Sequence, residues 1–320
     1  MEQEQNLLEY RQVDIHYGEK RVVQDFSLQM KPGEILGIVG ESGSGKSTVI
    51  RAAMGLLGDG GRVSNGQILY QDTDMTKVQG EELRQLRGAE IGMIFQNAGA
   101  SLCPIRTIEE QLYEAVLQHE TVPKAEIRDR ALRLFEQLRF TNGEEILNSY
   151  PFELSGGMNQ RVAIALAMIL NPQLLLADEP TSALDVTVQA QCVKEMMDLR
   201  QHLGTTIIIV THNMGVVSHM ADKVAVMYAG SIVEYGSKAD VLNHPKHPYT
   251  KALIASIPQI GGTIPKGIPG QPPAFGEVFT GCSFSPRCSL CDNICTHEKP
   301  VMHSGENGHA VFCHKCLSEV

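Results

Sequence analysis

The stretch ILGIVGESGSGKST, residues 35–48, passes from an apolar strand through a glycine-rich turn to the expected start of a helix near Lys46. Its turn meets the spacing G-x-x-x-x-G-K-[ST] with Gly40, Gly45, Lys46 and Ser47. In such a loop, backbone N–H groups close around nucleotide phosphates, the lysine neutralises charge and the hydroxyl ligates Mg²⁺. A glycine-rich turn without function is the alternative, and the flanking strand and helix argue against it. The stretch therefore predicts a nucleotide-phosphate site.

Four further apolar runs extend the pattern outward from this loop. They read IGMIF, QLLLAD, TIIIV and KVAVMYA, at residues 91–95, 173–178, 206–210 and 223–229. Their continuous hydrophobicity is typical of strands buried on both faces, and helical stretches separate several of them. The chain is therefore predicted to have an α/β fold with a mostly parallel sheet.

Two other regions complete the expected main domain. LLEYRQVDIHY and RVVQDFSLQM, residues 7–17 and 21–30, indicate strands near the N-terminus. TIEEQLYEAVLQH and KAEIRDRALRLFEQLRF, residues 107–119 and 124–140, carry apolar residues at helical spacing. We interpret residues 97–171 as a helical insert in the α/β core.

The C-terminal part differs in composition. After Gly236 we expect no further strands, because the sequence becomes rich in Pro, Gly, His and Cys. The expected division is a main domain over residues 1–236 and a C-terminal appendage over residues 237–320.

Composition excludes several function classes. The start, MEQEQNLLEY, lacks the basic and apolar regions of a signal peptide, and the longest uncharged apolar run, VAIALAMIL, is far shorter than the roughly 18 residues of a membrane span. The net charge is −10, with 37 acidic and 27 basic residues, so no general attraction to nucleic acid or anionic lipid is expected. Any membrane contact would then come through a protein partner.

Two acidic residues follow the run LLLAD at residues 174–178. Asp178 ends the expected buried strand, where a carboxylate can hold the magnesium shell, and Glu179 stands next to it toward the γ-phosphate. A strand ending in Asp-Glu is by itself more often a solvated strand end, but the upstream phosphate loop favours a metal site and a catalytic base.

The most diagnostic stretch is LSGGMNQR, residues 154–161. Ser155, Gly156 and Gly157 open a long apolar helix with small residues and bare N–H groups, a start that can bind phosphate. Because the local loop already binds one nucleotide, the second element suggests a role at the nucleotide of another subunit.

Taken together, these motifs resemble the ATP-binding subunits of ABC transporters over essentially the whole chain. Residues 40–48 resemble the Walker A motif, LLLADE the Walker B motif, and LSGGMNQR the signature that completes the partner's ATP site in a head-to-tail dimer. The resemblance implies a P-loop NTPase fold with a RecA-like core, an antiparallel β-subdomain and a helical subdomain. It implies nucleotide contacts by Tyr17, Gly40, Ser42, Gly43, Gly45, Lys46, Ser47, Thr48, Asp178, Ser155, Gly156, Gly157 and Asp185.

The resemblance also implies individual roles. Gln96 resembles the Q-loop glutamine, which contacts Mg²⁺ and the attacking water, so the implied Mg²⁺ ligands are Ser47, Gln96 and Asp178. Glu179 would polarise the water and His212 would touch the γ-phosphate as the switch histidine.

Two further positions follow from the same resemblance. Asp185, in SALD, matches the D-loop at the dimer interface. Tyr17 resembles the aromatic residue that stacks on adenine, with a core tyrosine at a strand edge as the competing interpretation.

The chain departs from the family pattern at two places. The signature usually continues with a basic residue where Asn159 stands, which puts a contact across the dimer in doubt. The Q-loop usually continues with Asp-Pro where residues 97–104 read NAGASLCP, which puts the surface facing the permease in doubt. Neither change removes a catalytic group.

The tail indicates the branch. HPKHPYTKALIASIP, IPGQPP and GCSFSPRC, at residues 244–258, 268–273 and 281–288, resemble the C-terminal extension of dipeptide, oligopeptide and nickel importer ATPases. The implied partners are a second, different ATPase subunit, two transmembrane permeases and an extracytoplasmic substrate-binding protein, with this chain peripheral on the cytoplasmic face of the membrane. The resemblance does not decide whether the transported substrate is a peptide, nickel or a metallophore.

Two rival functions were weighed against the importer. A soluble ABC ATPase acting on nucleic acid or the ribosome would have tandem ATPase domains or a basic face, yet the signature occurs once and the charge is negative. A P-loop kinase or GTPase would have no use for the Ser-Gly-Gly helix start.

Six of the eight cysteines lie in the tail, and Cys103 and Cys192 are isolated, which argues against a disulfide scaffold. Free thiols, structural zinc and an iron–sulfur cluster are the three interpretations. Zinc would use the C-x-x-C pairs of the tail, with two histidines as spare ligands: Cys288, Cys291, Cys313, Cys316, His309 and His314. The family resemblance instead implies a [4Fe–4S] cluster on Cys282, Cys288, Cys295 and Cys313.

Overall fold

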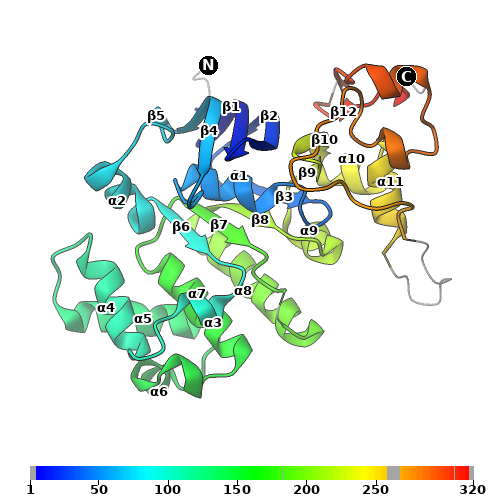
Figure 1. Cartoon of the computed structure of the whole chain (residues 1–320). Helices are drawn as coiled ribbons and strands as arrows, with labels where there is room; N and C mark the ends of the chain where they lie inside the picture. The colour runs from blue at the N-terminus through cyan, green and yellow to red at the C-terminus, as the bar shows by residue number, and fades with distance from the viewer. Residues whose placement is uncertain (1–4, 183, 258–266, 306, 317–320) are drawn as a thin grey trace. The chain divides into compact units, whose positions relative to one another are not determined.

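The computed structural model describes residues 5–182, 184–257, 267–305 and 307–316 (Figure 1). The chain forms two compact units. The first comprises Met1–Met30, Ile35–Thr76 and Val210–Val320, and the second comprises Lys31–Glu34 and Lys77–Ile209. Each unit is described by itself.

The first unit contains an antiparallel sheet in the order β2-β1-β4-β5. Its strands are β1 Leu8–Tyr17, β2 Lys20–Met30, β4 Gly61–Tyr70 and β5 Thr73–Asp74. Buried side chains such as Val13 and Ile15 share one face, as expected for a sheet that packs on one side only. The two strands expected near the N-terminus are confirmed.

The same unit holds five strands in the order β11-β12-β10-β9-β3. They are β3 Ile35–Val39, β9 Lys223–Tyr228, β10 Ser231–Ser237, β11 Met302–Ser304 and β12 Ala310–Phe312. Strands β3 and β9 pair in parallel, and every residue of β3 is buried. This arrangement confirms the prediction of an α/β core with parallel strands.

The expectation that strands cease after Gly236 is wrong. Strand β12 pairs antiparallel with β10, where Glu234 faces Val311 and Tyr235 faces Ala310. Strands β11 and β12 have three residues each, which is too short to show the alternating hydrophobic pattern of a strand. The sequence therefore shows no sign of them within a tail rich in Pro, Gly, His and Cys. The C-terminal segment thus extends the sheet of the first unit.

Short helices accompany these strands. In the first unit they are α1 Lys46–Ala53, α9 Met214–Met220, α10 Lys238–Asn243, α11 Pro248–Ala255, η2 Ser285–Arg287 and α12 Asn293–His297. Helix α1 begins at Lys46, as the sequence predicted.

The second unit contains three strands in the order β8-β7-β6, and β6 and β7 pair in parallel. They are β6 Ile91–Ile94, β7 Leu174–Asp178 and β8 Thr206–Val210. All residues of β7 and β8 are buried, which agrees with their continuous apolar sequence. Helices α2 Gly80–Ala89 and α8 Val186–Leu203 belong to the same unit.

The predicted helical insert is confirmed. It consists of α3 Ala98–Ser101, α4 Ile108–Leu117, α5 Lys124–Gln137, α6 Gly143–Asn148, η1 Pro151–Glu153 and α7 Gly156–Met168. Thr107 begins α4 with a capping box, and Ile108, Leu112 and Val116 form its buried face. Among the described residues, no helix is both long and apolar enough to cross a bilayer.

Candidate functional site

The loop between β3 and α1 has a backbone that only glycine tolerates at two positions. Gly40 has φ of 151°, and a Cβ there would lie 2.2 Å from the carbonyl oxygen of Met227. Gly45 has φ of 95°, and its Cβ would meet Val22 and Val23 of β2. The glycines of the motif therefore let the chain turn tightly against its neighbours and leave room for a ligand over the loop.

Lys46 lies across this loop. Its side chain is buried, and Nζ donates hydrogen bonds of 2.8 Å to the carbonyl oxygens of both Gly40 and Glu41. Ser42 and Gly43 are exposed on the outside of the turn, while Ser47 and Thr48 are half-buried at the start of α1. The loop thus brings together a cation, two exposed residues and a helix N-terminus, which are features of a phosphate-binding site.

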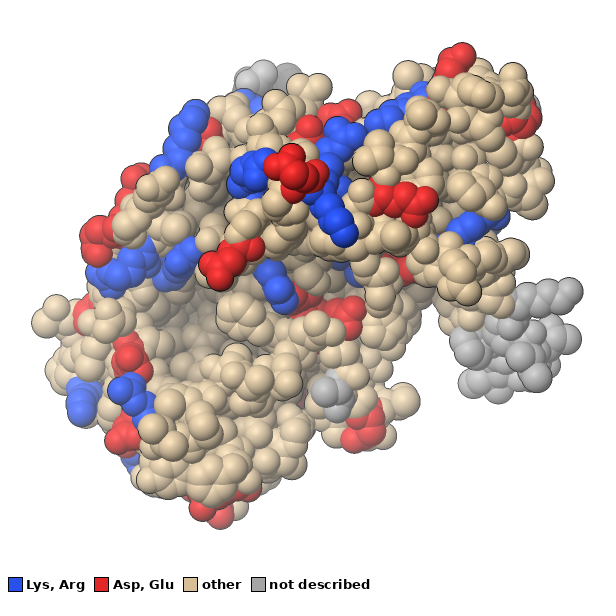
Figure 2. All heavy atoms as spheres, in the orientation of Figure 1, with Lys and Arg blue, Asp and Glu red and all other residues tan. Residues whose placement is uncertain are grey.

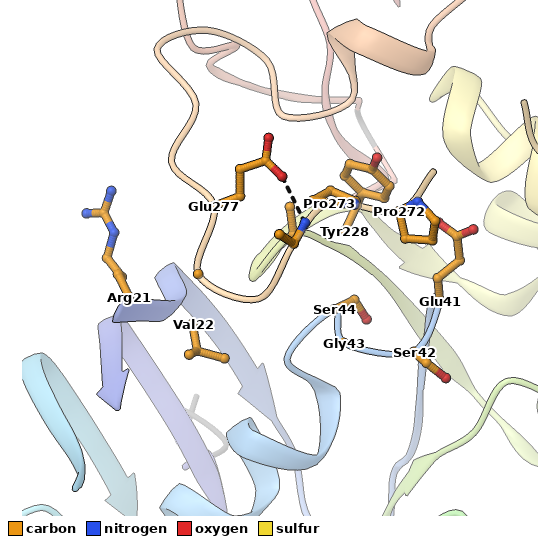
Figure 3. A pocket seen from close by; sticks show the side chains of 13 residues that line it. Arg21, Val22, Glu41, Ser42, Gly43, Ser44, Tyr228, Pro272, Pro273 and Glu277 are labelled. Carbon is orange, nitrogen blue, oxygen red and sulfur yellow. Dashed lines mark hydrogen bonds between the residues drawn. The ribbon is translucent and has the colours of Figure 1, made fainter. Parts of the chain in front are cut away.

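A pocket lies beside the turn. Arg21 and Val22 of β2 border it on one side, Ser42 to Ser44 of the loop on another, and the C-terminal segment that carries Pro272, Pro273 and Glu277 on a third (Figure 3). The dashed line in Figure 3 is the hydrogen bond from the Ala274 N–H to the carboxylate of Glu277. A part of the tail therefore borders the phosphate loop, a proximity that no sequence signal indicated.

Tyr17 ends β1 and is half-buried. Its ring lies 6.2 Å, centroid to centroid, from the ring of Phe275 in the C-terminal segment. The aromatic residue expected to stack on adenine thus has an aromatic neighbour that the sequence interpretation missed.

His212 follows β8 and is exposed. The adjacent residue, Thr211, donates its N–H to the carbonyl oxygen of Ile38 in β3, at 3.2 Å. His212 therefore lies near the end of the strand from which the phosphate loop starts.

In the second unit, Gln96 and Glu179 come together. The Gln96 Nε2 donates to Glu179 Oε2 at 3.3 Å, although 83 positions separate them. Asp178, at the end of β7, is fully buried. Glu179 has φ of 46°, a left-handed conformation that is uncommon outside glycine and that marks local strain at this position.

The signature stretch begins α7. Ser155 and Gly156 are exposed, and the Ser155 hydroxyl accepts the N–H of Met158 as a helix cap. A Cβ at Gly157 would lie 2.8 Å from the Val188 side chain, so this glycine allows close helix packing.

Two other residues near these helices serve local structure. Asp185 caps α8 and accepts the N–H groups of Thr187 and Val188. The Asn159 amide donates to the carbonyl oxygen of Pro151 at 2.9 Å, so it stabilises the segment before α7.

The cysteines of the tail lie near one another but are not arranged to coordinate a metal ion in the described residues. All eight cysteines are free thiols. Burial, with a smaller contribution from the charges of Cys313, Cys295 and Cys288, raises the pKa of Cys282 to about 11. Within the described ranges, no group of three or more His, Cys, Asp or Glu side chains is placed to hold a metal ion.

The two histidines considered as spare zinc ligands are engaged elsewhere. His309 is buried, and its Nε2 lies 2.7 Å from the carboxylate of Glu234. His314 Nε2 bonds the carbonyl oxygen of Glu298 at 3.0 Å. Each histidine thus uses one ring nitrogen in a hydrogen bond, and its role as a spare ligand stays a prediction.

The surface carries both charge signs. Figure 2 shows lysine and arginine interspersed with aspartate and glutamate on one face of the described residues, rather than a continuous basic patch.

Comparison with protein families places these features in a known context. The family model "ABC transporter" matches residues 23–182, and the model "Oligopeptide/dipeptide transporter, C-terminal region" matches residues 233–295.

Individual relatives agree with the family models. The chain is 41% identical to the oligopeptide transport ATP-binding protein AppD of Bacillus subtilis over 314 residues, covering 96% of each. It is 40% identical to the dipeptide transport ATP-binding protein DppD of Haemophilus influenzae, covering 98% of this chain and 96% of that one. A solved dimer of the ATP-binding cassette MJ0796 in a post-hydrolysis state, bound to ADP and Pi, has a TM-score of 0.64 and 28% identity, over 72% of this chain and 98% of that one.

Proposed function

Because this chain belongs to the ATP-binding proteins of ABC transporters, which hydrolyse ATP to drive transport, we propose that it powers the import of dipeptides or oligopeptides. The proposal that the transported substrate is a peptide rests on the match of residues 233–295 to the oligopeptide/dipeptide transporter C-terminal region. Relatives that align over nearly the full length of the chain support it. Its proposed domains are the ATPase, residues 1–236, and the extension, residues 237–320.

The proposed phosphate and adenine contacts come from the first unit. Lys46 and the N–H groups of residues 40–48 bind the phosphates, Tyr17 stacks on adenine, and His212 contacts the γ-phosphate. This assignment is supported by the turn geometry at Gly40 and by the buried Lys46.

The proposed hydrolytic groups follow from the family resemblance. Ser47, Gln96 and Asp178 have oxygen donors that suit Mg²⁺, which would neutralise charge on the phosphates when bound. Glu179 accepts a proton from the attacking water and Gln96 orients that water; their hydrogen bond supports this pairing.

Hydrolysis in this proposal requires a dimer. The exposed Ser155 and Gly156 at the start of α7 would face the γ-phosphate held by a second ATPase subunit, with Gly157 and Asp185 close to the same interface. The partners are a second, different ATPase subunit, two transmembrane permeases and an extracytoplasmic substrate-binding protein. The chain would lie on the cytoplasmic face of the membrane.

We also propose that Cys282, Cys288, Cys295 and Cys313 hold a [4Fe–4S] cluster that orders the tail. Four thiolates are the right donor set for a cubane. The Cys282 N–H donates to the carbonyl oxygen of Cys295 at 2.8 Å, so these two cysteines lie side by side, which supports the choice. Their present spacing does not yet form a ligating group, so binding would have to draw them together.

Anaerobic purification tests this cluster. The expected product is brown, bleaches on reduction and contains about four iron atoms per chain. A colourless protein with stoichiometric zinc would overturn the assignment in favour of a zinc site.

Transport itself is tested in proteoliposomes that contain the ATPase pair, both permeases and the binding protein. ATP-dependent uptake of labelled dipeptides or oligopeptides is expected, and it should vanish when Lys46→Ala replaces the wild-type chain. Uptake of nickel without uptake of any peptide would overturn the proposed cargo.

A further inference from the structure

An ion pair joins the tail to the phosphate loop. The guanidinium of Arg287 donates to both carboxylate oxygens of Glu41, at 2.6 and 3.1 Å. The Arg287 side chain is only 4% exposed, so water screens the pair poorly. Such a two-pronged contact fixes the carboxylate in direction as well as in charge.

Arg287 is itself held from several sides. It donates to the carbonyl oxygen of Pro269 at 2.8 Å and to the Tyr228 hydroxyl at 3.3 Å, and its guanidinium lies 5.8 Å from the centre of the Tyr228 ring. The pKa of Arg287 is raised, first by its hydrogen bond to Glu41, so the group stays charged. A cation so confined does not adapt freely if its partner is lost.

Glu41 is equally tied to the nucleotide site. Its N–H donates to the Tyr249 hydroxyl at 2.9 Å, and its carbonyl oxygen accepts the Lys46 ammonium at 2.8 Å. Glu41 is the first residue after Gly40 in the motif, so its carboxylate adds a negative charge to a loop built for an anion. Unpaired, this charge would repel the phosphates.

We propose that Arg287 is a positioning residue of the nucleotide site, which neutralises and orients Glu41 so that the C-terminal segment becomes a required part of the phosphate-binding loop. Arg287 also donates to the carbonyl oxygen of Ile268 at 3.4 Å. Ile268 and Pro269 directly precede the segment with Pro272 and Pro273, which borders Ser42 to Ser44 in Figure 3. The C-terminal segment therefore neutralises the Glu41 carboxylate through Arg287, and it also borders Ser42 to Ser44 through Pro272 and Pro273.

The test measures the affinity of the full-length chain for a fluorescent ATP analogue and for the matching ADP analogue. Removing the neutralising charge in Arg287→Gln should weaken ATP binding about tenfold. The loss should be about twofold smaller for ADP, which carries less charge. A general loss of structure would weaken both nucleotides equally and would overturn the proposal.

A charge cycle separates neutralisation from packing. Glu41→Gln alone leaves the Arg287 cation near the phosphates and should tighten ATP binding about twofold. The double variant Glu41→Gln with Arg287→Gln should recover affinity to within about threefold of wild type. Additive losses in the double variant, or weaker binding in Glu41→Gln, would contradict the proposal. Glu41→Gln keeps the test available if Arg287→Gln does not fold.

Two controls complete the experiment. Arg287→Lys keeps the charge but loses the two-pronged contact, so its ATP affinity should lie between those of wild type and Arg287→Gln. Arg84→Gln removes an equally two-pronged pair, with Glu81 in α2, and should leave nucleotide affinity unchanged.

This inference rests on the assignment of residues 40–48 to phosphate binding, and Lys46→Ala distinguishes the two failures. If Lys46→Ala binds ATP normally, the assignment of the loop is wrong. If Lys46→Ala loses binding but Arg287→Gln does not, only the role of Arg287 is wrong.

Discussion

Replacing Glu234 should detach the C-terminal segment from the sheet. The side chain is fully buried in β10, and its carboxylate accepts the N–H groups of Lys246 and His247 at 2.7 and 3.0 Å. Its third partner is His309 Nε2, at 2.7 Å. Glu234→Ala would leave two amides and one ring nitrogen buried without an acceptor.

The size of the effect follows from these three bonds. An unsatisfied buried donor costs about 1–3 kcal/mol, so the variant should lose about 3–5 kcal/mol of folding stability once partial relaxation is allowed. At the usual slope for a unit of this size, the melting temperature should fall by roughly 10 °C. Limited proteolysis should cut within the C-terminal segment first, because that segment loses its attachment.

The assay is thermal unfolding followed by circular dichroism, with proteolysis read by mass. Glu277→Ala is the matched control, because it removes a carboxylate that accepts only the N–H of Ala274 at the surface, and it should melt within about 2 °C of wild type. A Glu234→Ala chain that melts like the control, with an equally resistant tail, would refute the reasoning.

Two other predictions concern pH and assembly. Burial lowers the pKa of His247 to about 3, so this residue stabilises the fold above pH 6.5 and the contribution is lost as pH falls from there toward 3. His247→Asn should therefore make the melting temperature less steeply dependent on pH in that range, and an unchanged slope would contradict this. The purified chain alone should be a weak ATPase whose rate per chain rises with concentration or with added partner subunit, because its loop lacks a facing signature; strong, concentration-independent hydrolysis by a monomer would contradict the dimer.

The parallel strands were readable because their sequences are continuously apolar. Strands β3, β7 and β8 are buried along their whole length, so polar residues do not interrupt their apolar sequences. The phosphate loop was readable because its glycines and lysine have a fixed spacing. Both signals are local in the sequence.

Other elements carried no local signal. Strand β4, GRVSNGQILY, has only two buried residues, Ile68 and Tyr70, and contains Gly and Asn, so its sequence resembles a loop. Strands β11 and β12 are too short to show a hydrophobic period; β12 pairs with β10, and β11 pairs with β12.

The contacts of the tail with the loop are long-range. Glu41 and Arg287 are 246 positions apart, and each looks like an ordinary surface charge in its own segment. Phe275 beside Tyr17 is a similar case. Such pairings are set by how the tail packs, which composition and periodicity do not encode.

Glu179→Gln tests the central claim most directly. The substitution keeps the size of the side chain and removes the carboxylate that would accept a proton from the attacking water. Nucleotide affinity and hydrolysis are measured together in the complex with the second ATPase subunit and the permeases. The account predicts retained ATP binding, a stabilised dimer, and hydrolysis reduced by about a hundredfold or more. Hydrolysis near the wild-type rate with intact ATP binding would contradict it.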